Sequence, residues 1–372
     1  MTTYWLMFLM PALATFNFSD LKRRDGNHIW VAVIIILTLL IGLRHEVGGD
    51  WFDYFRHWNS VQNATLQETL ARSDPGYYFV NWLIARLGGS IYMVNLFCGA
   101  TIMIGVSYFA KRQPMPWLSL LVAIPYLLVV VAMGYTRQSA ALGFALIGLA
   151  ELGGQRIRNF VFWIVLGALF HKSALLLLPI AALGAAQNRL WTIIWVGVTG
   201  IFAGKFLLFE AADDLWVNYV EAGYSSQGGL IRVLMNAVPS IILLVFKDKL
   251  YLTEGEKKLW TWMAVFSLAS VGLVNYSSTA VDRVALYFIP IQMYIFARVP
   301  LLASTLQQCK GLMIGVMAYY ALVLFVWLNF AFHAFAWLPY QNSLIHDTSK
   351  TYGEPELFDK LPFSPDLLPR KH

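Results

Sequence analysis

The sequence predicts an all-α, polytopic integral membrane protein with about 10–12 transmembrane helices. Of the 372 residues, 58% are hydrophobic and only 13% are charged, whereas soluble domains carry roughly 25% charged residues. The apolar residues also stand in long continuous runs, unlike the alternating strands of a β-barrel. A soluble globular enzyme is excluded, because a chain of 372 residues encloses too little interior to bury so much apolar side chain.

Apolar segments follow one another along the whole chain. Crossing a bilayer takes about 20 mostly apolar residues, and the candidate segments are 3–18, 28–43, 91–109, 117–133, 136–152, 159–170, 174–186, 190–209, 230–246, 259–274, 284–297 and 311–332. Two of them, 159–170 and 174–186, are either two tilted helices or one helix broken at His171. We expect a single transmembrane domain over 1–345 and an extended, proline-rich tail over 346–372.

The charged residues are divided unevenly between the two sides of the membrane. Loops on one side hold 14 of the 27 Lys and Arg residues with six acids, which leaves 13 basic and 15 acidic residues for the other side. The net charges are therefore +8 and −2. Because cytoplasmic loops carry the excess of Lys and Arg, the first side is predicted to be cytoplasmic. Both termini and the long loops 44–90 and 210–229 then face outward.

The first outer loop, 44–90, contains two predicted interfacial helices. In the first, four aromatic residues recur at helical spacing: Trp51, Tyr54, Phe55 and Trp58. We expect Asp50 to cap this helix and its aromatic stripe to lie in the lipid headgroups. Asp53 and His57 would then share the opposite, polar face with Asp50. The alternative is a plain anchoring helix with a solvated outer face.

Asp74 and Pro75 are typical of a second helix start, with Asp74 as the N-cap and Pro75 at the first helical position. The alternative interpretation gives Asp74 no role beyond capping. Two further polar pairs stand at predicted outer helix ends, Arg137-Gln138 and Asp282-Arg283. Arg137 either snorkels to the headgroups or binds an anion inside the protein. Asp282 is either a cap or the partner in a salt bridge.

His171-Lys172-Ser173 is a polar break between two apolar segments. We expect Ser173 to cap the helix that follows, and a cation-bearing helix start favours anion binding. The alternative is that His171 is a satisfied structural residue. Five cations thus lie at one predicted membrane face: Arg44, Arg56, Arg137, Lys172 and Arg283. Guanidinium groups match phosphate bidentately, so this group predicts a site for a lipid-linked phosphate or pyrophosphate.

Other chemistry finds less support in the sequence. His45, Glu46, Asp50, Asp53 and His57 are ligand types at close spacing, but they match no metal motif of fixed geometry, and we predict no metal site. No phosphate-binding Gly-rich loop and no nucleophile elbow are present in the sequence. We therefore predict no cofactor and no nucleic-acid partner.

Several of these short motifs, in this order, resemble the EpsG family, whose members are similar to Wzy-type O-antigen and exopolysaccharide polymerases. The motifs are Gly42-Leu43-Arg44, Gly49-Asp50-Trp51 with Tyr54, Asp74-Pro75-Gly76-Tyr77, Arg137-Gln138-Ser139-Ala140, Phe170-His171-Lys172-Ser173-Ala174, Arg283 with Tyr287-Phe288, and Pro339-Tyr340. The resemblance covers about residues 1–345 and implies a membrane glycosyltransferase architecture of the GT-C-like type. The tail after Tyr340 is longer than the family pattern.

The resemblance implies a polysaccharide polymerase in the bacterial cytoplasmic membrane, with its active site facing the periplasm or the outside. Such an enzyme transfers a glycan from undecaprenyl pyrophosphate to a second lipid-linked repeat unit, for O-antigen, capsule or exopolysaccharide. Membrane lipids, a chain-length regulator and a flippase are the partners it suggests. The alternatives are a flippase or transporter for lipid-linked oligosaccharides and a membrane acyltransferase that modifies surface glycans.

The acceptor hydroxyl must lose a proton in that reaction, so a positioned base is expected. Asp50 is the first candidate, His171 the second and Asp53 the third. The predicted substrate contacts are Arg44, Tyr54, Arg56, Asp74, Arg137, Gln138, Lys172 and Arg283.

Overall fold

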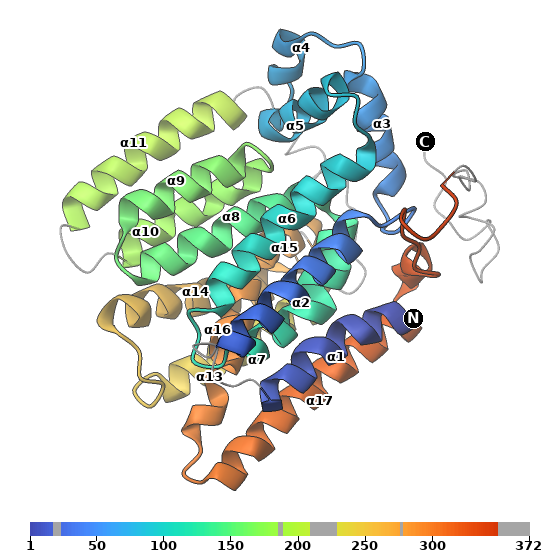
Figure 1. Ribbon diagram of the computed structural model, residues 1–372. Coiled ribbons are helices and arrows are strands. Elements are labelled where there is room, and N and C mark those ends of the chain that lie inside the picture. The colour runs from blue at the N-terminus through green and yellow to red at the C-terminus, as the bar shows by residue number, and fades with distance from the viewer. Residues whose placement is uncertain (18–23, 185–188, 209–228, 276–277, 349–372) are drawn as a thin grey trace.

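The computed structural model describes residues 1–17, 24–184, 189–208, 229–275 and 278–348. Within these ranges the protein is all-α, with helices packed side by side in one bundle and no strand (Figure 1). The predicted loop 210–229 and most of the predicted tail 346–372 lie outside the described residues.

The helical elements follow the predicted apolar segments closely. They are α1 (Thr2–Asn17), α2 (Arg24–Gly42), α3 (Trp51–Val61), α4 (Leu66–Leu70), α5 (Pro75–Arg86), α6 (Ile91–Ala110), α7 (Pro116–Ala123), the π-helix η1 (Ile124–Ala132), α8 (Thr136–Gly153), α9 (Ile157–Ala168), η2 (Lys172–Leu177), α10 (Leu178–Gly184), α11 (Arg189–Leu208), α13 (Gly229–Phe246), α14 (Glu254–Leu273), α15 (Ser278–Ala285), η4 (Leu286–Phe288), α16 (Ile289–Phe296), η5 (Val299–Leu302), α17 (Leu306–Phe330) and η6 (Phe332–Trp337).

Among the residues that the structure describes, four helical stretches are long and apolar enough to cross a membrane, and six shorter apolar helices accompany them. The long stretches are Ile91–Ala110, Gly229–Phe246, Val281–Leu302 and Leu306–Phe330. Large apolar side chains stay exposed on the outside of the bundle, such as Trp191 at 72% and Phe330 at 73%. Lipid is the solvent that favours such exposure, so the chain is a polytopic membrane protein.

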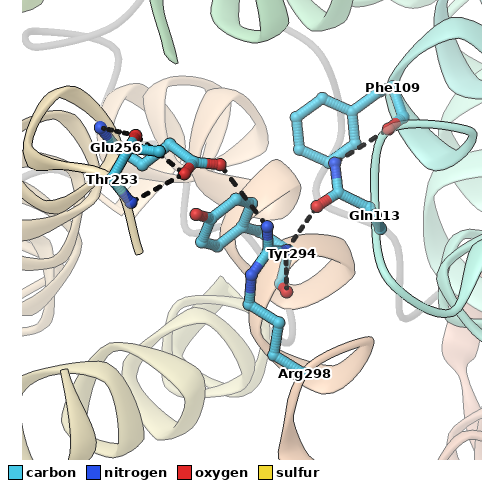
Figure 2. A network of polar contacts seen from close by, with 6 residues as sticks. All are labelled: Phe109, Gln113, Thr253, Glu256, Tyr294 and Arg298. Atoms are coloured by element: carbon cyan, nitrogen blue, oxygen red, sulfur yellow. Dashed lines mark hydrogen bonds and ion pairs between the residues drawn. The ribbon is translucent and has the colours of Figure 1, made fainter. Parts of the chain in front are cut away.

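Contacts between the connecting segments divide the bundle into two ends. At the end predicted to be cytoplasmic, here called the inner end, four sets of contacts join the connections (Figure 2 shows the last): Lys111 with Asn27, Arg112 with Glu151, Gln155 with Gly184, and Arg298 with Gln113 and Glu256. At the opposite, outer end the contacts join Tyr4 with Trp337, Arg44 with Thr136, Asp74 with Arg137, and Gln138 with Arg283. The predicted alternation of segments between two sides agrees with these contacts.

The stretch around His171 forms two elements, as the first of the two interpretations expected. α9 ends at Ala168, and η2 and α10 return through the bundle, so that Gln155 at the start of α9 lies 3.3 Å (Nε2 to O) from Gly184 at the end of α10. His171 therefore lies at a turn on the outer end. Polar residues suit this break, because the backbone groups at the two helix ends have no partners within a continuous helix.

Buried η1 leads directly to the outer end. All nine of its residues, Ile124–Ala132, are buried, and its wide turns leave the Val129 carbonyl free to accept a hydrogen bond from Trp337 Nε1 at 2.8 Å. π-Helices are rare and are often found at functional sites. The indole of Trp337 also packs on Gly134, where a Cβ would come within 2.8 Å of the ring. This close packing fixes the turn from which α8 begins.

Candidate functional site

The first turn of α8 is the centre of the outer end. Four consecutive residues here contact three distant segments of the chain. Thr136 binds Arg44 and Arg137 binds Asp74, while Tyr135 and Gln138 contact the side chain and the backbone carbonyl of Arg283. Motifs that are more than 200 residues apart in the sequence thus meet around four consecutive residues. We call the group formed by Asp50, Asp74, Arg137, His171, Lys172 and Arg283 the outer cluster.

Arg137 and Asp74 form the principal ion pair of the outer cluster. Arg137 Nη1 lies 2.7 Å from Asp74 Oδ2, and the two side chains are 28% and 6% exposed. Asp74 does occupy the N-cap position of α5 with Pro75 in the first turn, but its carboxylate makes no capping hydrogen bond. The predicted capping role is therefore wrong, because the carboxylate binds a cation from another helix instead.

Gly76 explains how α5 reaches this position. Its backbone N–H donates to the Leu169 carbonyl at 2.8 Å, and a Cβ at Gly76 would come within 2.9 Å of the Leu169 Cβ. Only glycine lets the start of α5 approach the end of α9 so closely. This contact carries Asp74 to the side of the bundle on which the polar break at 171–173 lies.

Two aromatic rings flank the Arg137 guanidinium. The Tyr54 and Tyr77 rings each lie 6.0 Å from Arg137 Cζ, and the Tyr54 hydroxyl accepts a hydrogen bond from the Arg137 backbone N–H at 3.4 Å. Arg137 Nε is buried and has no hydrogen-bond partner. A buried donor without a partner costs free energy. Arg137 therefore has one buried donor that no described residue of the protein satisfies.

Lys172 adds a second positive charge beside Asp74. Burial raises the pKa of Asp74, while Arg137 and then Lys172 act in the opposite direction by stabilising the carboxylate. The charged side chain of Lys172 comes from η2, at the outer turn between α9 and α10. Two cations from two different segments thus face one buried carboxylate.

His171 and Ser173 form a hydrogen-bond chain with Tyr287. His171 Nδ1 lies 2.5 Å from Ser173 Oγ, which lies 3.0 Å from the Tyr287 hydroxyl on η4. Ser173 was predicted to cap the following helix, which is wrong: His171 holds the N-cap position of η2 and the Ser173 hydroxyl binds the two other side chains. Burial, and after it the nearby charges of Arg137, Arg283 and Lys172, together lower the pKa of His171 to about 3.

Asp50 lies at the N-cap position of α3, and its side chain makes no capping hydrogen bond. The predicted capping role is wrong here too. Burial raises the pKa of Asp50 to about 6, against the opposing effects of Arg283 and Arg137 and with a smaller raising effect from Asp53. Such a carboxylate changes its protonation state close to neutral pH. This is a property expected of a general base.

Gln138 and Arg283 close the other side of the outer cluster. Gln138 Nε2 donates to the Arg283 carbonyl at 3.0 Å, and Arg283 Cζ lies 5.6 Å from the centre of the Tyr135 ring. The preceding residue, Asp282, is no cap: it binds Arg232 of α13 through two bonds of 2.6 Å. This confirms the alternative of a neighbouring salt bridge.

Arg44 differs from the cations of the outer cluster. It is 1% exposed and donates to the carbonyls of Val47 and Ile41 and to Thr136 Oγ1, one bond from each guanidinium nitrogen. It thus holds the end of α2 against the start of α8, next to Arg137. Its contacts show it bound to the protein, which makes it a support for the site more than a substrate contact.

The structure corrects the predicted orientation of α3. Trp51, Tyr54 and Trp58 are buried against protein, and only Phe55 of the aromatic stripe is exposed, at 41%. The stripe therefore packs on the bundle and does not lie in the headgroups. Arg56 stands apart from the outer cluster, on the outer surface of α3, where it pairs with Asp53.

Sequence reasoning missed the supporting residues of the site. Tyr77 flanks Arg137, Thr136 receives Arg44, and Trp337 buttresses the turn before α8. Tyr77 is marked by its place in the Asp74-Pro75-Gly76-Tyr77 motif, but no sequence signal identifies Thr136 or Trp337. Within the described ranges, no three His, Cys, Asp or Glu side chains lie close enough together to hold a metal ion.

Comparison with known proteins gives one match. Neither the curated proteins nor the solved structures include one that matches this chain significantly. The model of the EpsG family matches residues 27–342, a range that includes the whole outer cluster and most of the chain. The protein therefore belongs to the EpsG family.

Proposed function

We propose that this protein polymerises lipid-linked oligosaccharide repeat units at the outer face of the cytoplasmic membrane. In this reaction a glycan is transferred from undecaprenyl pyrophosphate to a hydroxyl group of a second lipid-linked unit. The EpsG family implies a polymerase-like role in exopolysaccharide biosynthesis, and the proposal specifies the donor, the acceptor and the residues. Membrane lipids surround the enzyme, and a flippase and a chain-length regulator would act with it.

The observation that carries the proposal is the arrangement around Arg137. Its guanidinium is held by the buried Asp74, is flanked by two tyrosine rings and keeps a buried Nε without a partner. Lys172 and Arg283 contribute their charges from two further segments, as their effects on Asp74 and His171 show. A pyrophosphate is a dianion or trianion whose oxygens match such cations. The apolar bundle surface beside the cluster suits the polyprenyl tail.

The chemistry needs a base and a site for the leaving group. In the step proposed, the acceptor hydroxyl oxygen forms a bond to the anomeric carbon of the donor. The bond from that carbon to the pyrophosphate oxygen breaks, and the leaving oxygen takes the electron pair. Asp50 takes the hydroxyl proton, since burial raises its pKa to about 6 and brings it near working pH. The donor's own phosphate ester supplies the driving force.

The cations act on the charge that develops as the bond breaks. A cationic group fixed in a partly buried site stabilises developing charge more strongly than the same group in water. Arg137 is fixed by Asp74 and by its own backbone bond to Tyr54, so it needs no reorganisation during the step. Its fork geometry makes it the residue for which lysine is the poorest substitute.

The test is polymer formation from a purified lipid-linked repeat unit in detergent. We expect Arg137→Lys to reduce the rate by roughly 10²–10³-fold at unchanged protein level, because lysine keeps the charge but not the fork. Arg56→Lys is the matched control, since Arg56 forms an exposed ion pair outside the outer cluster, and its rate should stay within about twofold of wild type. Wild-type chain length from Arg137→Lys would refute the assigned role of Arg137.

A cellular experiment separates the polymerase from the flippase alternative. Cells that lack the protein should export single repeat units if it is a polymerase, because the units are still flipped and only their joining is lost. If the protein is instead a transporter, no unit reaches the outer face. The glycan ladder of the deletion strain, with and without the Arg137→Lys gene, distinguishes the two.

A further inference from the structure

The hydrogen-bond chain that ends on His171 links two elements that are far apart in the sequence. Tyr287 belongs to η4 and is 1% exposed, while Ser173 belongs to η2, 114 residues earlier in the sequence. The Tyr287 hydroxyl lies 3.0 Å from Ser173 Oγ, and Ser173 Oγ lies 2.5 Å from His171 Nδ1. The mechanism proposed above uses none of these three groups. A chain of this kind in a buried site needs an explanation, because each buried hydroxyl must find a partner.

The direction of the chain follows from the acidity of its members. A phenol is a stronger donor and a weaker acceptor than an aliphatic hydroxyl, since its pKa is near 10. Tyr287 therefore donates to Ser173, and the Ser173 hydroxyl donates to Nδ1 of His171. A neutral imidazole has one protonated and one unprotonated nitrogen. With Nδ1 accepting, the proton of His171 lies on Nε2.

The surroundings of His171 favour this neutral form. Arg137, Lys172 and Arg283 all exert a positive potential on the imidazole, and burial disfavours its charged form in the same direction. Asp74 is the one carboxylate of the outer cluster near Tyr287, and Arg137 binds it. A base that must accept a proton among three cations works against their charge. A neutral donor works with them, because both attract the same anionic oxygen.

We propose that Ser173 and Tyr287 are positioning residues that fix the Nε2–H tautomer of His171, and that His171 donates this hydrogen bond to an oxygen of the departing pyrophosphate. The inference rests on the proposed polymerase reaction and assigns His171 a role other than that of the base. No proton changes place in this contact. The leaving oxygen keeps its electron pair, and the acceptor proton still goes to Asp50.

The first readout is the tautomer itself, which requires no activity. Nitrogen NMR of the full-length protein with ¹⁵N-labelled histidine distinguishes protonated from unprotonated ring nitrogens, and His171→Gln identifies the signal. We expect an Nε2–H imidazole in wild type and a changed Nδ1 shift in Ser173→Ala and Tyr287→Phe. Tyr320→Phe is the matched control, because that buried hydroxyl binds Gln292 at 2.7 Å, outside the site. An Nδ1–H imidazole in wild type would overturn the proposal.

The second readout is the polymerisation assay with purified variants. Tyr287→Phe should lower kcat about tenfold, the effect of one lost hydrogen bond, with little change in KM. Ser173→Thr should retain activity that Ser173→Ala loses. His171→Gln, whose amide nitrogen replaces Nε2, should remain at least tenfold faster than His171→Asn, which should lose roughly 10²–10³-fold.

Failure of the inference and failure of the proposed function give different results. If wild-type protein makes no polymer, the polymerase reaction is refuted, and the NMR result alone decides whether Ser173 and Tyr287 orient His171. If wild type polymerises but His171→Gln is as slow as His171→Asn, and the residual rates of both variants have lost the acid limb of the pH profile, His171 is the base and the inference is wrong. Variants that misfold are recognised by a lowered thermal midpoint, and the conservative Ser173→Thr then carries the test.

Discussion

Arg298 at the inner end is buried and Arg137 at the outer end is partly buried, and their partners differ. The Arg298 guanidinium binds Gln113, the Tyr294 carbonyl and Glu256, and it stacks on the Tyr294 ring at 3.6 Å (Figure 2). Only 6% of Arg298 is exposed. Arg137 has one carboxylate partner, two rings at 6.0 Å and a buried Nε without a partner, and its side chain is 28% exposed.

This difference distinguishes charged residues that stabilise the fold from charged residues of the candidate site. Thr253 and Glu256 form a capping box at the start of α14, so that the partner of Arg298 is itself fixed by its own helix. The Arg298 guanidinium takes all its printed acceptors from the protein itself and ties α14 to η5 and the loop after α6. The outer cluster brings together cations from several segments, and the buried Nε of Arg137 has no hydrogen-bond partner in the protein. What distinguishes the outer cluster is the meeting of several cations from different segments around a buried carboxylate.

The largest effect in a comparison of the two ends is expected for Asp50→Asn. An amide cannot accept a proton at neutral pH, so the chemical step should fall by roughly 10²–10⁴-fold if Asp50 is the base. Its thermal midpoint at pH 7.5 should be unchanged or higher, because burial raises the pKa of Asp50 and the charged form is therefore the costly one. The assay is polymer formation at matched protein level.

The inner-end counterpart is Glu151→Gln. Glu151 is a buried carboxylate that accepts hydrogen bonds from Arg156, Asn159 and Tyr108. We expect this variant to lower the thermal midpoint while the activity per folded molecule stays near wild type. Near-normal polymer from Asp50→Asn, or a dead but stable Glu151→Gln, would break the distinction between the two ends.

The pH dependence of kcat/KM should follow the ionisation of Asp50 at the outer end. Asp50 must be deprotonated to act, and its pKa is raised to about 6, so the rate should fall about tenfold per pH unit below that value. In stability the sign is opposite: the protonated form is favoured in the folded protein, so this contribution is present at low pH and is lost as pH rises through about 6. A profile that stays flat down to pH 4.5 would remove Asp50 from the mechanism.

A smaller effect, on stability alone, is expected for Arg298→Ala. The variant leaves Gln113 and Glu256 without their partner, which costs about 1–3 kcal/mol of unfolding free energy for a buried polar group. The thermal midpoint in detergent should fall, and the rate per folded molecule should stay within about threefold. Arg137→Lys should give the opposite result: its polymerisation rate should fall and its thermal midpoint should stay unchanged. A loss of rate in Arg298→Ala without a change in midpoint would contradict the comparison.

The smallest effect is expected for Arg56→Ala. Arg56 and Asp53 form a salt bridge in which the side chains are 57% and 56% exposed, and exposed pairs contribute about 0–1 kcal/mol. Neither the thermal midpoint nor the polymer length should change measurably. A shortened polymer would bring Arg56 back among the substrate contacts, as its sequence position first suggested.

The sequence predicts the membrane class, the helical segments and the two-sided arrangement, because these depend on composition and on the placement of apolar runs. It also predicts which motifs meet, since Asp74, Arg137 and Lys172 all stand at outer helix ends. It fails on what each polar side chain binds. Asp74, Ser173 and Asp282 occupy places typical of caps, and each binds a distant side chain instead.

Two further limits have physical reasons. Helical periodicity identifies the aromatic face of α3, but an aromatic face suits both a lipid interface and a protein interior, so it could not say that Trp51 and Trp58 are buried on the bundle. A buried arginine likewise has the same sequence signature whether its acceptors are backbone carbonyls, as for Arg44, or a substrate. Partners that are distant in sequence decide both cases.

The contacts of Trp337 join segments from the two ends of the described chain. Its carbonyl accepts from the Tyr4 hydroxyl at 2.6 Å, its indole rests on Gly134 and bonds to Val129, and Tyr340 next to it bonds to the Leu40 carbonyl at 2.8 Å. α1 is therefore joined to a segment that lies 333 residues later in the sequence. A chain cut after α17 would contain every residue of the outer cluster and would lack the Trp337 contacts that fix the turn before Arg137. Integrity of the site therefore depends on a segment that contributes no residue to the outer cluster.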